Sequence, residues 1–151
     1  MKRLLIPVFL PLMLVAQSGG PSCKGCAAGK LMLQCDYYVV RQGDVGKRHF
    51  CADYAKIVDI DGASAKAAWY WLLAGEPEKA FDAALRAYNQ GQTFAAGYAA
   101  QALAVMGNAD EAKKFLNKFL SAVRDRGYFE KEVATLEKLY PAKDLKILEV
   151  K

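Results

Sequence analysis

The chain has 151 residues, of which 54% are hydrophobic and 25% are charged. This balance is typical of one globular domain with a sizeable core, and it excludes a disordered chain. The formal net charge is +5, but basic and acidic residues alternate along the chain without forming a concentrated basic patch. Such interleaving is typical of solvated helix faces and argues against nucleic acid as a partner.

Residues 1–18 have the three parts of a secretory signal peptide. Lys2 and Arg3 precede an apolar run over residues 4–16, and Ala16 and Ser18 supply the small residues of a cleavage site. The run is shorter than the ~20 residues that span a bilayer. We therefore expect cleavage after residue 18, a periplasmic or secreted mature chain and no membrane span. A retained N-terminal anchor is the alternative.

A short cysteine-containing segment, residues 19–27, follows the leader. It holds Cys23 and Cys26, and the only other cysteines are Cys35 and Cys51. An even number in an exported chain favours disulfides. The C-x-x-C pair indicates either a local structural disulfide or a thiol-disulfide or metal-handling protein acting through these two residues. A crossed pairing with the later cysteines is also open. Because zinc sites more often use two close pairs, we expect no bound metal.

Three glycines recur at an interval of 32 residues: Gly43, Gly75 and Gly107. Each follows a stretch with helical character and precedes a polar residue, a short turn and a second helical stretch. Glycine commonly ends helices because it adopts the left-handed conformation without penalty. The pattern predicts three helical hairpins over residues 28–126, which must stack because one hairpin cannot bury its apolar face alone.

The second and third units, residues 69–88 and 99–120, resemble the tetratricopeptide repeat family. Residues 75–80 and 107–112 look like the family's turn followed by the small residue of its second helix. The period is shorter than the family's usual 34. The resemblance implies an all-α solenoid that works as a protein-interaction module and needs no cofactor.

The first unit departs from the repeat pattern. Asp36 and Arg48 stand where the later units have small residues that let paired helices touch. These two side chains form an opposite-charge pair, or the unit is an atypical cap. In the same register, Cys35 falls on the inner face of a first helix and Cys51 on the second helix of that hairpin. We therefore expect a disulfide between them.

The repeat pattern ends after residue 126. Residues 128–139 have apolar side chains at helical spacing, and Pro141 stops this helix. We expect residues 127–151 to form a helix that caps the last repeat, followed by a short tail.

No arrangement in the sequence predicts catalysis. His49 is the only histidine, no serine lies in a nucleophile elbow, and no pair of carboxylates suits acid–base chemistry. We expect a protein that is not an enzyme.

The resemblance implies a concave groove, lined by first helices, that receives a peptide or partner protein. A self-association surface that forms a homo-oligomer is compatible with the same face. The predicted partner-binding residues are Tyr37, Arg41, Trp69, Leu73, Phe94 and Gln101. The competing interpretation is that Tyr37 and Trp69 pack between neighbouring repeats.

Overall fold

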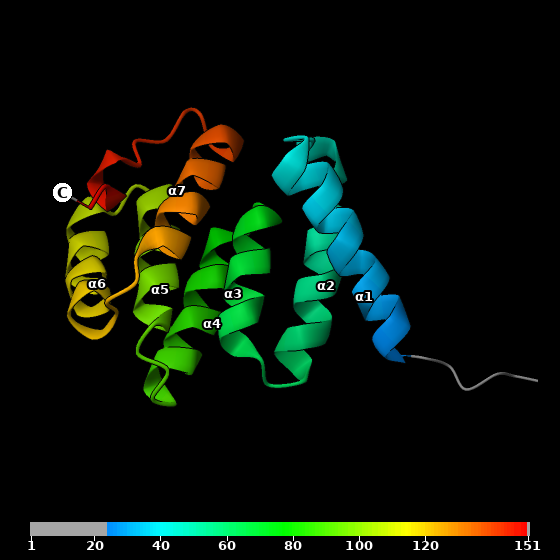
Figure 1. Cartoon of the computed structure of the whole chain (residues 1–151), viewed down its shortest axis with the longest axis horizontal. Coiled ribbons are helices and arrows are strands. Elements are labelled where there is room, and N and C mark those ends of the chain that lie inside the picture. The colour runs from blue at the N-terminus through cyan, green and yellow to red at the C-terminus, as the bar shows by residue number, and fades with distance from the viewer. Residues whose placement is uncertain (1–23, 151) are drawn as a thin grey trace, which may run out of the picture.

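The computed structural model describes residues 24–150, and this part of the chain contains seven α-helices and no strand (Figure 1). The predicted all-α class is confirmed. The α-helices are α1 (Lys24–Cys35), α2 (His49–Ile60), α3 (Ser64–Leu73), α4 (Pro77–Asn89), α5 (Ala95–Val105), α6 (Ala109–Ala122) and α7 (Gly127–Leu139). Three short helical segments complete the fold: η1 (Asp36–Arg41), which is π-helical, and the 3-10 turns η2 (Val45–Lys47) and η3 (Lys146–Leu148).

The helices from α1 to α6 pack side by side in chain order, each against the next (Figure 1). Short turns reverse the chain between them. The glycines found at the fixed interval end the first helices: Gly75 and Gly107 both have φ of +82°. After each glycine, the next backbone N–H reaches back to a carbonyl five residues earlier, from Glu76 to Trp71 and from Asn108 to Leu103. This hydrogen bond closes the helix end and starts the turn.

Two helices are apolar on every side. Every residue of α3 except Lys66 is buried, and every residue of α5 except Tyr98 is buried. The helices between and after them, α4 and α6, bury one face only, through small or apolar residues such as Ala80 and Ala112. Because a helix that is apolar all round needs cover on more than two sides, α3 and α5 require a further layer beyond their chain neighbours.

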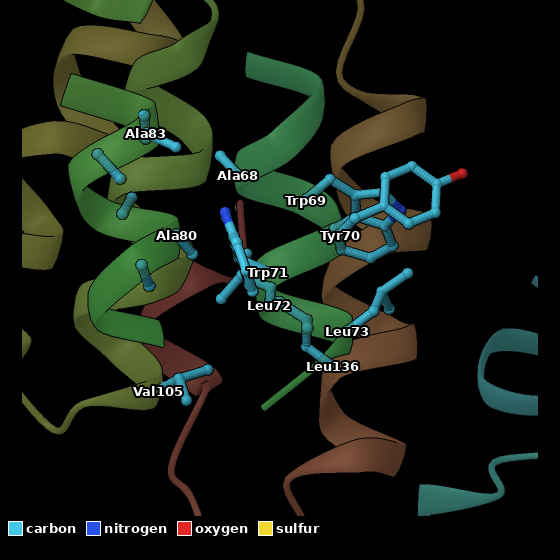
Figure 2. Packing of buried hydrophobic residues seen from close by; sticks show 14 of the residues in the cluster. Ala68, Trp69, Tyr70, Trp71, Leu72, Leu73, Ala80, Ala83, Val105 and Leu136 are labelled. Carbon is cyan, nitrogen blue, oxygen red and sulfur yellow. The ribbon is translucent and has the colours of Figure 1, made fainter. Parts of the chain in front are cut away.

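Helix α7 supplies that layer by folding back across α3 and α5 (Figure 1). Figure 2 shows Trp69, Tyr70 and Leu73 on the side of α3 toward α7, and Leu136 of α7 in the same cluster of buried side chains. The predicted helix is present, and it contacts α3 as well as the last hairpin, α5 and α6. The tail segment η3 also contacts α6 and α5.

Both ends of α7 are fastened to the other helices. At its start, the rings of Phe129 and Phe119 of α6 stack with centroids 4.7 Å apart. At its end, an Arg48 Nη2 donates a hydrogen bond to the Leu139 carbonyl at 3.0 Å, and the guanidinium lies over the Tyr140 ring. The Tyr140 hydroxyl donates to a backbone carbonyl of α3.

The sequence-predicted pair of Asp36 and Arg48 does not form. Arg48 is used at the end of α7, and Asp36 accepts a hydrogen bond from Tyr70 at 3.3 Å. Asp36 begins the π-helical segment η1, whose wider turn changes the helical register after Cys35. The alignment by sequence offset compared residues within one hairpin, and so it did not identify Tyr70 of α3 and Leu139 of α7 as the partners of Asp36 and Arg48.

The predicted disulfide between Cys35 and Cys51 is confirmed. The sulfurs are bonded at 2.06 Å, and both side chains are fully buried between α1 and α2. The bond closes a loop over a sequence separation of 16 and joins the end of α1 to α2. Within residues 24–150, no helix combines the length and hydrophobicity that crossing a membrane requires.

Removing this disulfide should lower stability. For the double variant Cys35→Ala and Cys51→Ala, we expect the free energy of unfolding to fall by about 3 kcal/mol, because the unfolded chain regains the entropy of an open loop of this size. Urea unfolding followed by circular dichroism measures the change. A double variant within about 0.5 kcal/mol of the parent, as for an ordinary surface substitution, would show that this hairpin does not depend on the bond.

Candidate partner-binding groove

A groove of about 760 Å³ runs over the N-terminal half of α3, with η1 on one side and α7 on the other. In Figure 1, α7 is the orange helix on one side of α3, and η1 is the cyan end of the ribbon that continues α1, on the other side beyond α2. The two exceptions to burial on α3 and α5, Lys66 and Tyr98, both line this groove. The first helices of the second and third hairpins, α3 and α5, form one surface that we call the first-helix face. The groove therefore occupies the part of this face that α7 leaves uncovered.

Aromatic side chains supply much of the groove lining: Trp69, Tyr70, Phe94, Tyr98 and Tyr128. Phe94 is 46% exposed and Tyr128 is 68% exposed, so both can contact a bound molecule. Trp69 also lines the groove but is only 9% exposed, so little of its side chain is open to a ligand. Its ring centroid lies 6.5 Å from that of Tyr98. Large aromatic surfaces of this kind are typical anchors in binding sites.

A buried carboxylate joins α7 to α5 beside the groove. The Tyr98 hydroxyl donates to Glu132 Oε1 at 3.1 Å, and Gln101 Nε2 donates to Glu132 Oε2 at 3.0 Å. Gln101 is fully buried and Glu132 almost so. Both carboxylate oxygens therefore have a donor from α5, and the pair of hydrogen bonds sets where α7 lies on that helix.

Burial controls the titration of this carboxyl group. Desolvation raises the pKa of Glu132 to about 7, although the hydrogen bonds from Gln101 and Tyr98 act in the opposite direction by stabilising the carboxylate. The protein interior disfavours the charged form more than these two donors favour it. The folded state therefore binds a proton on Glu132 more tightly than the unfolded state does.

A second carboxylate lies at the η1 wall. Asp36 Oδ1 accepts from the Tyr70 hydroxyl, and burial raises the pKa of Asp36 even though that hydrogen bond and the nearby Arg41 and Lys66 lower it. Arg41, Lys66 and, from α7, Lys131 line the groove and are exposed. The groove thus combines an aromatic lining with cations at its rim.

The structure separates the six predicted partner-binding residues into two groups. In the first group, Arg41, Trp69 and Phe94 line the groove, and Tyr37 is open to solvent outside it. Leu73 and Gln101 are fully buried, because α7 and the neighbouring helices cover them, and a partner cannot reach them in this conformation. Most of the Trp69 side chain is buried, which agrees with the competing interpretation that it is a packing residue. Tyr37 is half-exposed and is not among the groove-lining residues.

The sequence reasoning missed the contribution of α7. Tyr128, Lys131, Glu132 and Thr135 all line the groove from this helix. A signal was present, because Glu132 directly precedes Val133 in the apolar stripe of the predicted helix, where a charged side chain is unexpected unless it has partners. The nearly complete hydrophobicity of α3 and α5 was a second sign that another helix had to cover them.

The C-x-x-C motif lies at the edge of the described chain. Cys26 is disulfide-bonded, whereas Cys23 and the expected leader lie outside the described residues. Among the described side chains, no cluster of three or more histidines, cysteines or carboxylates could hold a metal ion. A scan against protein-family models, a search of curated proteins and a search of solved structures each found no match to this chain.

The raised pKa of Glu132 predicts that stability increases as pH falls. Below about 4.5 the group is protonated in both states, whereas above about 7 the folded protein must hold a buried charge. From about pH 5 to pH 8, the free energy of unfolding should decrease by about 2 kcal/mol through this group. In Glu132→Gln, which keeps the shape of the side chain without the charge, this part of the pH dependence should disappear.

Urea unfolding at a series of pH values measures this effect. The same pH slope in the parent and in Glu132→Gln would contradict the assignment. Glu130→Gln, on the exposed surface of the same helix, is the matched control and should retain the slope of the parent.

Proposed function

We propose that this chain is an exported protein-interaction module, built from tetratricopeptide-like helical hairpins, that binds a peptide segment of a partner protein in the groove between η1 and α7. It is not an enzyme in this proposal. The aromatic groove is the observation that carries the proposal. Its size suits a short extended segment, and its lining offers apolar rings beside polar hydroxyls.

The hairpin arrangement supports the comparison with tetratricopeptide repeats. Gly75 and Gly107 end successive first helices in the same conformation, at the interval found in the sequence. The small residues expected at the helix contacts, Ala80 and Ala112, are fully buried. The groove differs from the open concave face of the family, because α7 covers the middle of the first-helix face. A ligand would therefore lie beside α7 rather than along the whole first-helix surface.

Two features support a location outside the cytoplasm. The leader-like residues 1–18 predict export. The buried disulfide between Cys35 and Cys51 fits an oxidising compartment, since such bonds are rare in the cytosol of most organisms.

Intrinsic fluorescence offers a direct binding assay, because the chain has only two tryptophans. Trp69 lines the groove, whereas Trp71 is buried and its Nε1 has no hydrogen-bond partner among the described residues. The variant Trp71→Phe therefore loses no hydrogen bond and leaves Trp69 as the reporter. An array of tryptophan-free synthetic peptides that tile exported proteins of the native host provides the ligands.

We expect Phe94→Ser and Tyr128→Ser to weaken binding of a peptide found in this way by about tenfold or more, as for aromatic anchors of an interface. Leu33→Ser is the matched control, since Leu33 is 65% exposed but lies on α1 outside the groove. All three variants should unfold at the parent temperature. If no peptide changes the Trp69 signal, or if Leu33→Ser weakens binding as much as the groove variants, the proposal is wrong.

A further inference from the structure

We propose that the groove selects acidic peptide segments, in which carboxylate side chains alternate with apolar ones. The inference rests on the proposed function and adds the chemical class of the ligand. It is carried by the charges around the groove: three exposed cations form no ion pair with a described residue, whereas Glu132 is buried with both oxygens hydrogen-bonded, and Asp36 is half buried and accepts a hydrogen bond from Tyr70.

Three cationic side chains reach the groove from three separate elements. Arg41 belongs to η1, Lys66 to α3 and Lys131 to α7. None of them forms an ion pair in the described part of the chain, where the four ion pairs all involve other residues. All three are exposed, so a ligand can reach their charges. The Lys66 ammonium also lies 5.3 Å from the centre of the Tyr54 ring, which holds it in place without neutralising it.

The two carboxylates of the groove, Glu132 and Asp36, are poorly placed to bind a basic ligand. Both oxygens of Glu132 already accept hydrogen bonds from α5, and the side chain is buried. Asp36 Oδ1 accepts the Tyr70 hydroxyl, and Asp36 interacts electrostatically with Arg41 and Lys66. A basic ligand would therefore find only the half-buried Asp36 as a carboxylate within reach, which already interacts with Arg41 and Lys66, and it would meet three positive charges at the rim.

The surface between these cations is apolar and aromatic. Phe94 and Tyr128 are the most exposed rings there, and Val40 and Ala65 belong to the same lining. A ligand that carries only charge would leave this surface uncovered, whereas an apolar peptide would leave the cations unpaired. A segment that alternates acidic and apolar side chains satisfies both, because side chains on an extended chain point alternately to opposite sides and can be divided between rim and floor.

The test uses three acetylated and amidated peptides on the Trp71→Phe protein: Glu-Phe-Glu-Leu-Glu-Leu, the same sequence with Gln in place of Glu, and the same with Lys in place of Glu. A fourth peptide is the Gln sequence with a free C-terminal carboxylate. We expect the acidic peptide to bind about tenfold tighter than the Gln peptide and to weaken as salt rises, with no measurable binding of the Lys peptide.

Charge variants then locate the effect on the protein. We expect Lys66→Gln and Lys131→Gln each to weaken binding of the acidic peptide by about two- to fivefold, as for the loss of an exposed ion pair. Lys138→Gln is the matched control for Lys131→Gln, because it makes the same change on the same helix but outside the groove. It should leave the affinity unchanged.

Several outcomes would overturn the inference while leaving the proposed function in place. These are equal binding of the acidic and Gln peptides, tighter binding of the Lys peptide, or an affinity for the acidic peptide that Lys66→Gln and Lys131→Gln do not change. If the Gln peptide with a free C-terminus binds as tightly as the acidic peptide, the groove recognises a chain end, and the inference about acidic side chains fails. Failure of every peptide, including all those of the tiled array, would overturn the proposed function as well.

Discussion

The structure depends on the burial of two helices that are apolar on every side. α3 and α5 each expose no more than one residue, Lys66 or Tyr98, and neither can be covered by its chain neighbours alone. Burying such surfaces is the dominant favourable term in folding, so a chain with these two helices must place a further element over them. α7 is that element. Leu136 is fully buried against the first-helix face, and Glu132 accepts hydrogen bonds from α5 that fix the position of the helix.

The groove follows from the same constraint. α7 covers the central part of the first-helix face, and the uncovered remainder lies between α7 and η1, where the exposed Lys66 of α3 and the partly buried Tyr98 of α5 line the groove. The π-helical segment forms this wall: it contains Asp36, which accepts a hydrogen bond from Tyr70, and Arg41, which lines the groove. Arg48 in turn is free to hold the end of α7 instead of pairing with Asp36. The walls of the groove are thus set by contacts between segments far apart in the sequence, and the groove results from how the core is closed.

The sequence predicted the local parts of this arrangement and missed the long-range ones. Gly75 and Gly107 identified the helix ends because a left-handed residue is a local requirement that glycine meets. The pairing of Cys35 with Cys51 followed from hairpin register, which extends over little more than a dozen residues. By contrast, the site of α7 is a question of tertiary packing, and the apolar spacing of its sequence indicates a helix but not its partner. The partners of Asp36 and Arg48 lie on α3 and α7, outside the hairpin that the alignment compared. Of the candidate site, Arg41, Trp69 and Phe94 were found in the groove lining, whereas the α7 residues were not foreseen.

The central claim is that α7 is an integral layer of the fold that closes the first-helix face. Amide hydrogen exchange of the protein, resolved by residue, tests it most directly. The claim predicts that the amides of α7 from Glu132 to Leu139 exchange as slowly as those of α3 and α5, because opening α7 would expose both apolar helices and unfold the domain. Fast exchange throughout α7, with α3 to α6 still protected, would contradict it. It would show that the first-helix face is stable when open, and that the groove has the larger, continuous form expected from the repeat pattern alone.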